Sequence, residues 1–178
     1  VPRYIKTAST AGADLYSWGY RWLIHETGHN LGLPDTYGWQ LPSSMFWVGG
    51  WGMMGNIGGQ STEHFAWEKW KFGWIRDDQV DVVTQRGQTT HYLSPVETPG
   101  GTKMVVIPVS PSLVYVAEFR TKQGNNAERA TEWGVLIYRM DSSVSHSYGP
   151  VTADNVPKAC AQVISNLWFK QGYTAPPF

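Results

Sequence analysis

The sequence predicts an α+β protein in which the helices come first and the strands follow. Two segments near the start carry apolar and polar residues at helical spacing. From residue 77 onward, short runs rich in β-branched and aromatic residues are separated by Gly, Pro and Asn. The 178 residues suffice for one good core, or for a core with a small satellite domain. We therefore expect a division into residues 1–76 and 77–178.

The first predicted helix runs from about Tyr16 to Leu31, because tryptophans and histidines recur there at helical spacing. Gly28 weakens this helix by roughly 1 kcal/mol relative to alanine. Gly32 stands where a residue with left-handed backbone would end the helix, and Pro34 prevents its resumption.

A second helix is expected after the glycine- and tryptophan-rich loop of residues 38–60. Ser61 is its predicted N-cap and Glu63 lies in its first turn, while Gly73 ends it. Three tryptophans are spaced to share one face of this helix: Trp67, Trp70 and Trp74.

The second region is predicted to form an antiparallel sheet, either as a small sandwich or as an extension of the first region. The C-terminal segment YTAPPF (173–178) is expected to be extended and poorly ordered. Four runs carry the strand signal: VDVV (80–83), KMVVIPV (103–109), LVYVAEF (113–119) and WGVLIYRM (133–140).

Composition narrows the classes of function. The formal net charge is zero, only 16% of residues are charged, and no basic block occurs, which argues against nucleic acid and anionic membranes as partners. No apolar run approaches the length of a membrane span. The single cysteine, Cys160, excludes an internal disulfide framework.

The segment HETGHNLGLPDTY carries the strongest functional signal. His25 and His29 lie four residues apart on a helix, so both imidazoles project from one face and can meet one ion. Glu26 is the next residue along the helix after His25, where it can hold a water near the ion and take its proton. Zinc requires a third protein ligand, and Gly32 permits the chain to turn back with Asp35. The sequence therefore predicts a zinc site.

This segment matches the pattern HExxHxxGxxD. It closely resembles the zinc peptidases of the immune inhibitor A type and also snapalysin, and both groups belong to the metzincin-like zincins. The resemblance extends over residues 16–141. Four further segments carry it, as the methionine turn, the helix after it and two downstream strands: WGMMG (51–55), STEHFAWEKWKFGWI (61–75), VYVAEFRTKQG (114–124) and GVLIYRMD (134–141).

The resemblance implies a zincin-like active-site helix and lower catalytic subdomain, followed by an antiparallel β-rich region. It implies a secreted zinc endopeptidase acting on protein or peptide substrates, with zinc bound by His25, His29 and Asp35 and Glu26 as general base. Tyr37 matches a tyrosine of the snapalysin motif, which would donate a hydrogen bond to the oxyanion. A buried aromatic ring with a satisfied hydroxyl is the alternative for Tyr37.

Some positions leave alternatives or depart from relatives. Met54 is the implied methionine of the turn, with Met53 as the alternative. Asn56 stands where several metzincins have tyrosine, and other metzincins use histidine as the third ligand. Glu63 competes as third ligand, because another zincin branch takes that ligand from a glutamate on a later helix. His64 is expected to be a surface or capping residue.

Zincins normally pack the active-site helix on a sheet formed by upstream sequence. Only 24 residues precede His25, and they contain no convincing sheet, so we expect a fragment whose partner is the missing N-terminal part of the catalytic domain. No calcium site can be read from the sequence.

The competing class is a non-catalytic, β-rich fragment of a larger peptidase that binds glycan or protein. The ten tryptophans favour it. Trp39, Trp47 and Trp51 would line a substrate groove or cover the region of the methionine turn. The complete metal set favours the enzyme.

Overall fold

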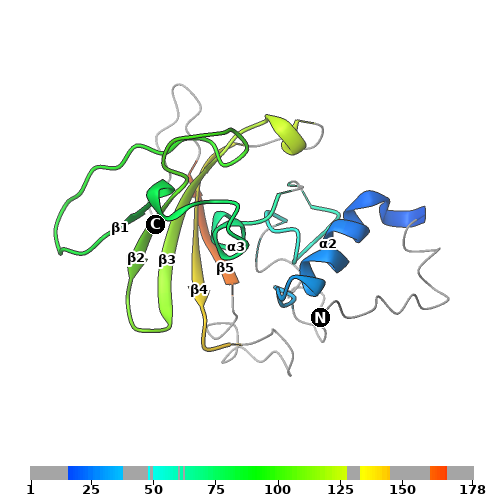
Figure 1. Cartoon of the computed structure of the whole chain (residues 1–178), viewed down its shortest axis with the longest axis horizontal. Coiled ribbons are helices and arrows are strands. Elements are labelled where there is room, and N and C mark those ends of the chain that lie inside the picture. Colours follow the sequence, from blue (N-terminus) through cyan, green and yellow to red (C-terminus); the bar gives the residue numbers. More distant parts are fainter. Residues whose placement is uncertain are drawn as a thin grey trace.

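The computed structural model describes residues 16–37, 48, 50–59, 61, 63–127, 133–144 and 161–167. Helix α2 lies at one end of the molecule and a five-stranded sheet at the other, with the short helix α3 between them (Figure 1). Helices precede strands, so the α+β class is confirmed. The C-terminal residues 173–178 lie outside the described part of the chain.

Helix α2 spans Tyr20–Asn30. A helical turn over residues 16–18 precedes it, and Gly19, with φ of 61°, separates the two. The predicted helix is therefore present but interrupted near its start, because Gly19 adopts the left-handed backbone that glycine tolerates.

Helix α3 spans only Ala66–Lys71 and its N-cap is Phe65, so the prediction of an N-cap at Ser61 is wrong. Its first turn is held by Glu68, whose carboxylate accepts the Phe65 N–H at 2.9 Å. The Ser61 hydroxyl is instead buried and bonded to distant residues of the chain.

The tryptophans of this region do not share one face of α3. Trp67 and Trp70 pack against the core, with ring centroids 5.3 Å apart. Gly73 has φ of 76° and ends the helical region before Trp74. Trp74 is therefore off the helix, and it is 58% exposed.

The four predicted strands are present, and a fifth that the sequence did not predict adds to them. The strand order follows the sequence. Two single-turn 3-10 helices, η2 (Asp77–Gln79) and η3 (Gly124–Asn126), lie outside the sheet. The strands are β1 (Val80–Val82), β2 (Met104–Pro108), β3 (Leu113–Arg120), β4 (Gly134–Asp141) and β5 (Ala161–Leu167).

The sheet is mixed, so the expectation of a wholly antiparallel region is wrong. Strands β2 to β5 pair antiparallel, whereas β1 pairs parallel with β2. The connection over residues 83–103 is long enough to return the chain to the same end of the sheet, which a parallel pair requires. These strands form a single sheet.

The core lies between α3 with its preceding loop and one face of the sheet. Phe65 stacks on Tyr138 at 4.4 Å between ring centroids, and both side chains are fully buried. Each buried aromatic or aliphatic side chain stabilises the fold by roughly 1.5–3 kcal/mol. The cluster of buried hydrophobic residues that forms this core includes residues on both sides of position 76. The division into residues 1–76 and 77–178 stays a prediction.

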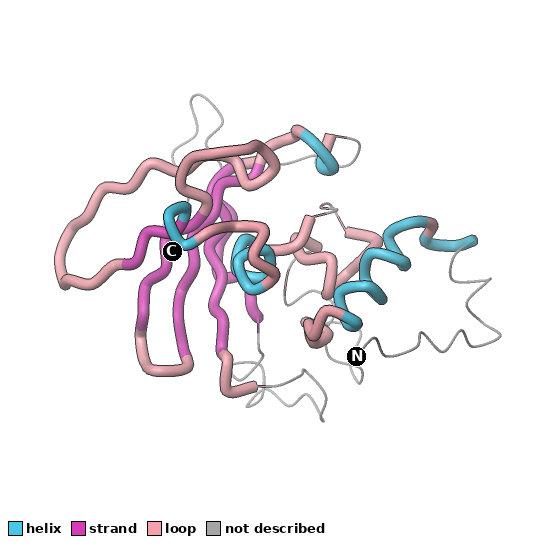
Figure 2. Tube along the Cα trace, viewed as in Figure 1, coloured by secondary structure: helices cyan, strands magenta, loops and turns pink. Residues whose placement is uncertain are grey.

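Residues 50–59, which are part of the connection between α2 and α3, form loop rather than regular structure (Figure 2). Trp51 in this loop belongs to the core cluster and is 4% exposed, so it covers the turn region instead of lining a groove. Trp39 and Trp47 lie outside the described residues.

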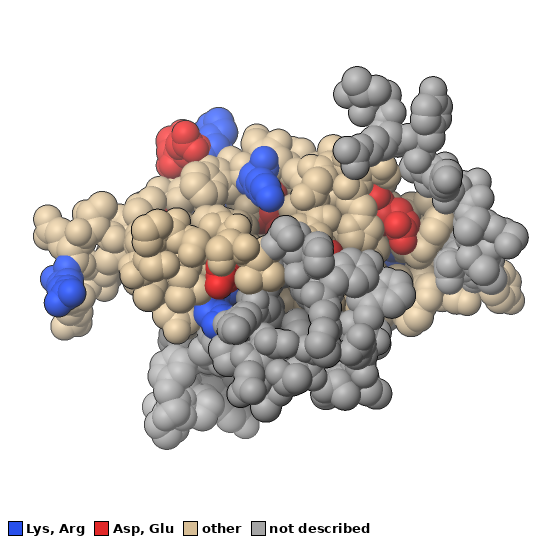
Figure 3. All heavy atoms as spheres, turned by 90° about the horizontal axis from the view of Figure 1, so that it is seen from below, with Lys and Arg blue, Asp and Glu red and all other residues tan. Residues whose placement is uncertain are grey.

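Charged side chains on the face drawn in Figure 3 are scattered among residues of other kinds. None of the helices in the described ranges has the length and hydropathy that crossing a bilayer requires. Leu23 on α2 and Leu31, the C-cap of this helix, are about half exposed, at 47% and 53%. Packing of a further part of a catalytic domain against α2 stays a prediction.

Candidate metal centre

Helix α2 presents His25 and His29 on one face, as the four-residue spacing predicts. Their Nε2 atoms lie 3.1 Å apart and their ring planes are perpendicular. His25 is buried, whereas the His29 side chain is 33% exposed. The pair is therefore open to solvent on the side of His29.

The turn after α2 brings the third side chain back to this pair. Gly32 has φ of 94°, and its N–H donates to the His29 carbonyl at 3.0 Å. The Leu33 N–H donates to the Gly28 carbonyl at 3.0 Å, which completes a Schellman motif. The predicted reversal at Gly32 is confirmed, and it directs Asp35 towards the histidines.

Three donor atoms converge where the chain returns. Asp35 Oδ1 lies 3.1 Å from the Nε2 atom of His25 and 3.1 Å from that of His29. Asp35 is 4% exposed. Among the described residues, this is the one group of three or more His, Cys, Asp or Glu side chains with ligand atoms close enough to share an ion.

Backbone carbonyls fix the orientation of both rings. His25 Nδ1 lies 2.8 Å from the Met53 carbonyl oxygen, and His29 Nδ1 lies 2.9 Å from that of Leu33. A carbonyl oxygen only accepts, so each Nδ1 carries the proton, and a neutral ring presents a bare lone pair at Nε2. Three lone-pair atoms 3.1 Å apart repel one another unless a proton or a cation lies between them. The second ring nitrogen of a metal-binding histidine is usually anchored in this way.

The charges of the metal-free site follow from the same contacts. A hydrogen bond with Asp35 raises the pKa of His29 above its ordinary value, although burial opposes the shift. Burial would raise the pKa of Asp35, but hydrogen bonds from His25 and His29 outweigh it and hold that pKa well below the usual range. The pair thus favours an ionised carboxylate facing a protonated ring, and a divalent cation can replace that proton.

The donor set fits zinc. Zinc binds imidazole nitrogen and carboxylate oxygen at about 2.0–2.2 Å, usually with tetrahedral geometry. Tetrahedral angles place such donors about 3.3–3.6 Å from one another. The observed separations of 3.1 Å are slightly shorter, so the three donors would move apart by a few tenths of an ångström to hold zinc.

The turn of Met53 and Met54 contacts the residues that form the site. The Met54 carbonyl accepts the Thr36 N–H at 2.9 Å, which fixes the loop beside Asp35. Both methionines are fully buried. A Cβ added at Gly28 would lie 3.2 Å from the Met54 Cε, and closer still to its sulfur. Gly28 therefore lets Met54 pack directly against the helix backbone.

Glu26 and Tyr37 lie beside the three donors. Glu26 is half-buried, and its charge contributes to the raised pKa of His29. The Tyr37 ring centroid lies 6.2 Å from that of His25, with the ring planes tilted by 34°. The structure thus brings His25, His29 and Asp35 together, with the Tyr37 ring near His25 and Glu26 next to it on α2. The roles of Glu26 as base and Tyr37 as hydrogen-bond donor stay predictions.

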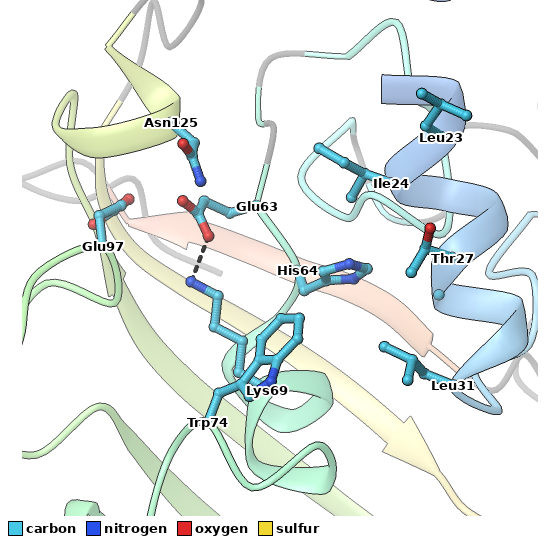
Figure 4. Close-up of a pocket in the computed structure, with 11 residues that line it drawn as sticks. Leu23, Ile24, Thr27, Leu31, Glu63, His64, Lys69, Trp74, Glu97 and Asn125 are labelled. Atoms are coloured by element: carbon cyan, nitrogen blue, oxygen red, sulfur yellow. Dashed lines mark ion pairs between the residues drawn. The ribbon is translucent and has the colours of Figure 1, made fainter. Parts of the chain in front are cut away.

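Glu63, the competing third ligand, does not join this group. Its carboxylate pairs with the Lys69 ammonium in a cavity of about 510 Å³ that separates α2 from the α3 region (Figure 4). On α2 this cavity is lined by residues such as Leu23 and Ile24, and none of the three donors lines it. Asp35 is the carboxylate that meets the two histidines.

The remaining histidines of the described residues have other partners. His64 is buried, and its Nδ1 lies 3.3 Å from Glu68 Oε2, so the expectation of a surface position is wrong. His91 bridges Asp81 at 3.1 Å and Thr89 at 2.9 Å, and it is not a member of the ligand-spaced group found among the described residues.

No family model matches the sequence, and neither curated proteins nor solved structures match it.

The sequence did not predict the carbonyl oxygens of Leu33 and Met53 as partners of the two histidine rings, because a backbone acceptor cannot be recognised from the residue types.

Proposed function

We propose that this chain is a zinc-dependent endopeptidase in which His25, His29 and Asp35 hold the ion and Glu26 is the general base. The observation that carries the proposal is the convergence of two Nε2 atoms and one carboxylate oxygen, with each Nδ1 held by a carbonyl. The similarity of the motif to immune inhibitor A-type peptidases and to snapalysin supports a zincin-like catalytic region and a secreted protein.

When bound, zinc supplies Lewis acidity, which polarises a peptide carbonyl and lowers the pKa of water from about 16 towards 7. Glu26 accepts a proton as water attacks the scissile carbonyl and delivers it to the leaving amine. Tyr37 donates a hydrogen bond to the developing oxyanion. The two histidines hold their positions throughout, since their Nδ1 atoms donate to backbone carbonyls of the turns around them.

The test combines metal analysis with casein hydrolysis. We expect one zinc per chain and hydrolysis that a chelator abolishes. Glu26→Gln should lower the rate by about 10²–10⁴-fold while the zinc content stays the same, because the general base is lost but no ligand is. Asp78→Asn is the matched control, since it makes the same carboxylate-to-amide change at an exposed residue away from the cluster. Full activity in Glu26→Gln would remove the mechanism.

The second candidate is a non-catalytic fragment that binds glycan or protein. Its support is the exposure of aromatic side chains near α2: Tyr16 is 93%, Trp18 45% and Trp74 58% exposed. Zinc-free protein that binds an oligosaccharide and hydrolyses no casein would favour this candidate over the peptidase.

A further inference from the structure

A buried polar cluster joins strand β3 to the chain that precedes α3. Arg120 is 1% exposed and donates to the Ser61 hydroxyl at 2.8 Å and to the His64 carbonyl at 3.1 Å. Glu118, fully buried, pairs with the Arg120 guanidinium and accepts the Ala66 N–H at 2.6 Å. Two side chains of the sheet thus hold residues 61–66 from both ends.

A chain of hydrogen bonds runs from this cluster to the metal centre. The Ser61 hydroxyl accepts the Glu63 N–H at 3.2 Å. The Glu63 carbonyl accepts the Met53 N–H at 3.2 Å. The Met53 carbonyl in turn accepts the proton on His25 Nδ1 at 2.8 Å. Each link is made by atoms whose position depends on the link before it.

Within the described ranges, no such chain of hydrogen bonds leads to the Nδ1 atom of His29. Its Nδ1 bonds to the Leu33 carbonyl, which is four residues away and belongs to the turn that ends α2. The two histidines are therefore anchored differently, because one anchor is local and the other depends on a strand more than fifty residues later in the chain.

The composition of the cluster also points to a role in geometry rather than in stability. A buried ion pair contributes little net stability, because desolvation of both charges offsets their attraction. Here each of the three guanidinium nitrogens of Arg120 makes a hydrogen bond. Glu118 also accepts the Tyr138 hydroxyl at 2.8 Å. Such a fully bonded cluster specifies one position for the segment that it holds.

We propose that Arg120 and Ser61 are positioning residues that set the orientation of the His25 ring through Glu63 and Met53. His29 takes its orientation from its own turn and does not depend on them. The inference rests on the proposed function only in taking zinc as the ion that uses the two rings.

The experiment observes the Nδ1 protons of both histidines by NMR in metal-free protein. Ser61→Ala removes one oxygen from the cluster and leaves the fold's apolar core intact. We expect the His25 Nδ1 proton to exchange with solvent at least about 10-fold faster, while the His29 proton is unchanged. Zinc affinity should fall about 10-fold or more, as for other residues that orient a ligand.

Two further variants make the result decisive. Ser61→Cys keeps a weakly polar group of similar size, so it should accelerate exchange of the His25 proton less than Ser61→Ala does. Val116→Ala changes a core residue of β3 outside the cluster, so it controls for general loss of stability and should not change one histidine selectively. Equal acceleration of both protons in Ser61→Ala, or of neither, would overturn the inference. Failure to bind zinc would instead overturn the proposed function, because the proton measurement uses no metal.

Discussion

Gly28 offers a quantitative test of the packing beneath the metal centre. Alanine in place of glycine within a helix ordinarily raises stability by roughly 1 kcal/mol. Here the new Cβ would press on the fully buried Met54 side chain. Overpacking at a buried site costs about 1–3 kcal/mol. We therefore expect Gly28→Ala to change the free energy of unfolding by between about zero and −2 kcal/mol, instead of raising it.

A double-mutant cycle separates the two terms. In a Met54→Ala background the obstacle is absent, so Gly28→Ala should raise the free energy of unfolding by about 1 kcal/mol. The coupling between the two positions is then about 1–3 kcal/mol. Thr27→Ala, at the exposed neighbouring residue, is the control and should stabilise by about 0.5 kcal/mol in both backgrounds.

The assay is urea unfolding in the presence of a chelator, which removes any contribution of bound metal to stability. An equal gain from Gly28→Ala in both backgrounds would refute the contact between the helix backbone and Met54. It would also leave Gly28 without a packing reason for its place in the last turn of α2.

Three further predictions concern the ion and its surroundings. Asp35→Ala should release zinc because it removes one of three donors. Glu63→Ala should retain zinc and lose about 1–3 kcal/mol of stability because Lys69 loses its partner. Stoichiometric zinc in Asp35→Ala, measured by atomic absorption, would point to Glu63 as the ligand. Zinc at about 100 times its Kd should raise the free energy of unfolding by about 2.7 kcal/mol, and a thermal melt that is the same with zinc and with chelator would contradict this. Tyr37→Phe should lower kcat roughly 100-fold at unchanged KM, because its hydroxyl serves only the developing charge. An unchanged kcat would mean that the Tyr37 ring only packs beside His25.

The features that the sequence predicted are those set by neighbouring residues. His25 and His29 share a face because α-helical geometry alone puts residues four apart together. Gly32 reverses the chain because a positive φ is available to it without steric cost. The four strands were readable for the same reason, since their runs of β-branched residues are local.

The features that escaped prediction depend on distant contacts. Ser61 has the residue type of an N-cap, yet its hydroxyl is taken by Arg120 and Asn126, so α3 begins later. The parallel pairing of β1 depends on the path of a long connection and not on the residues of the strand. No local pattern marked Met53 as the partner of His25, because the contact uses only its backbone oxygen.

The hydrogen bonds that orient the His25 and His29 rings determine which parts of the chain a synthetic peptide mimic of the site would have to include. A thirteen-residue peptide with the sequence of residues 25–37 would contain every proposed ligand and the Leu33 carbonyl, but not the Met53 carbonyl. One imidazole in such a peptide would remain free to rotate, and grafting the motif onto another scaffold would require a backbone oxygen supplied from outside the helix.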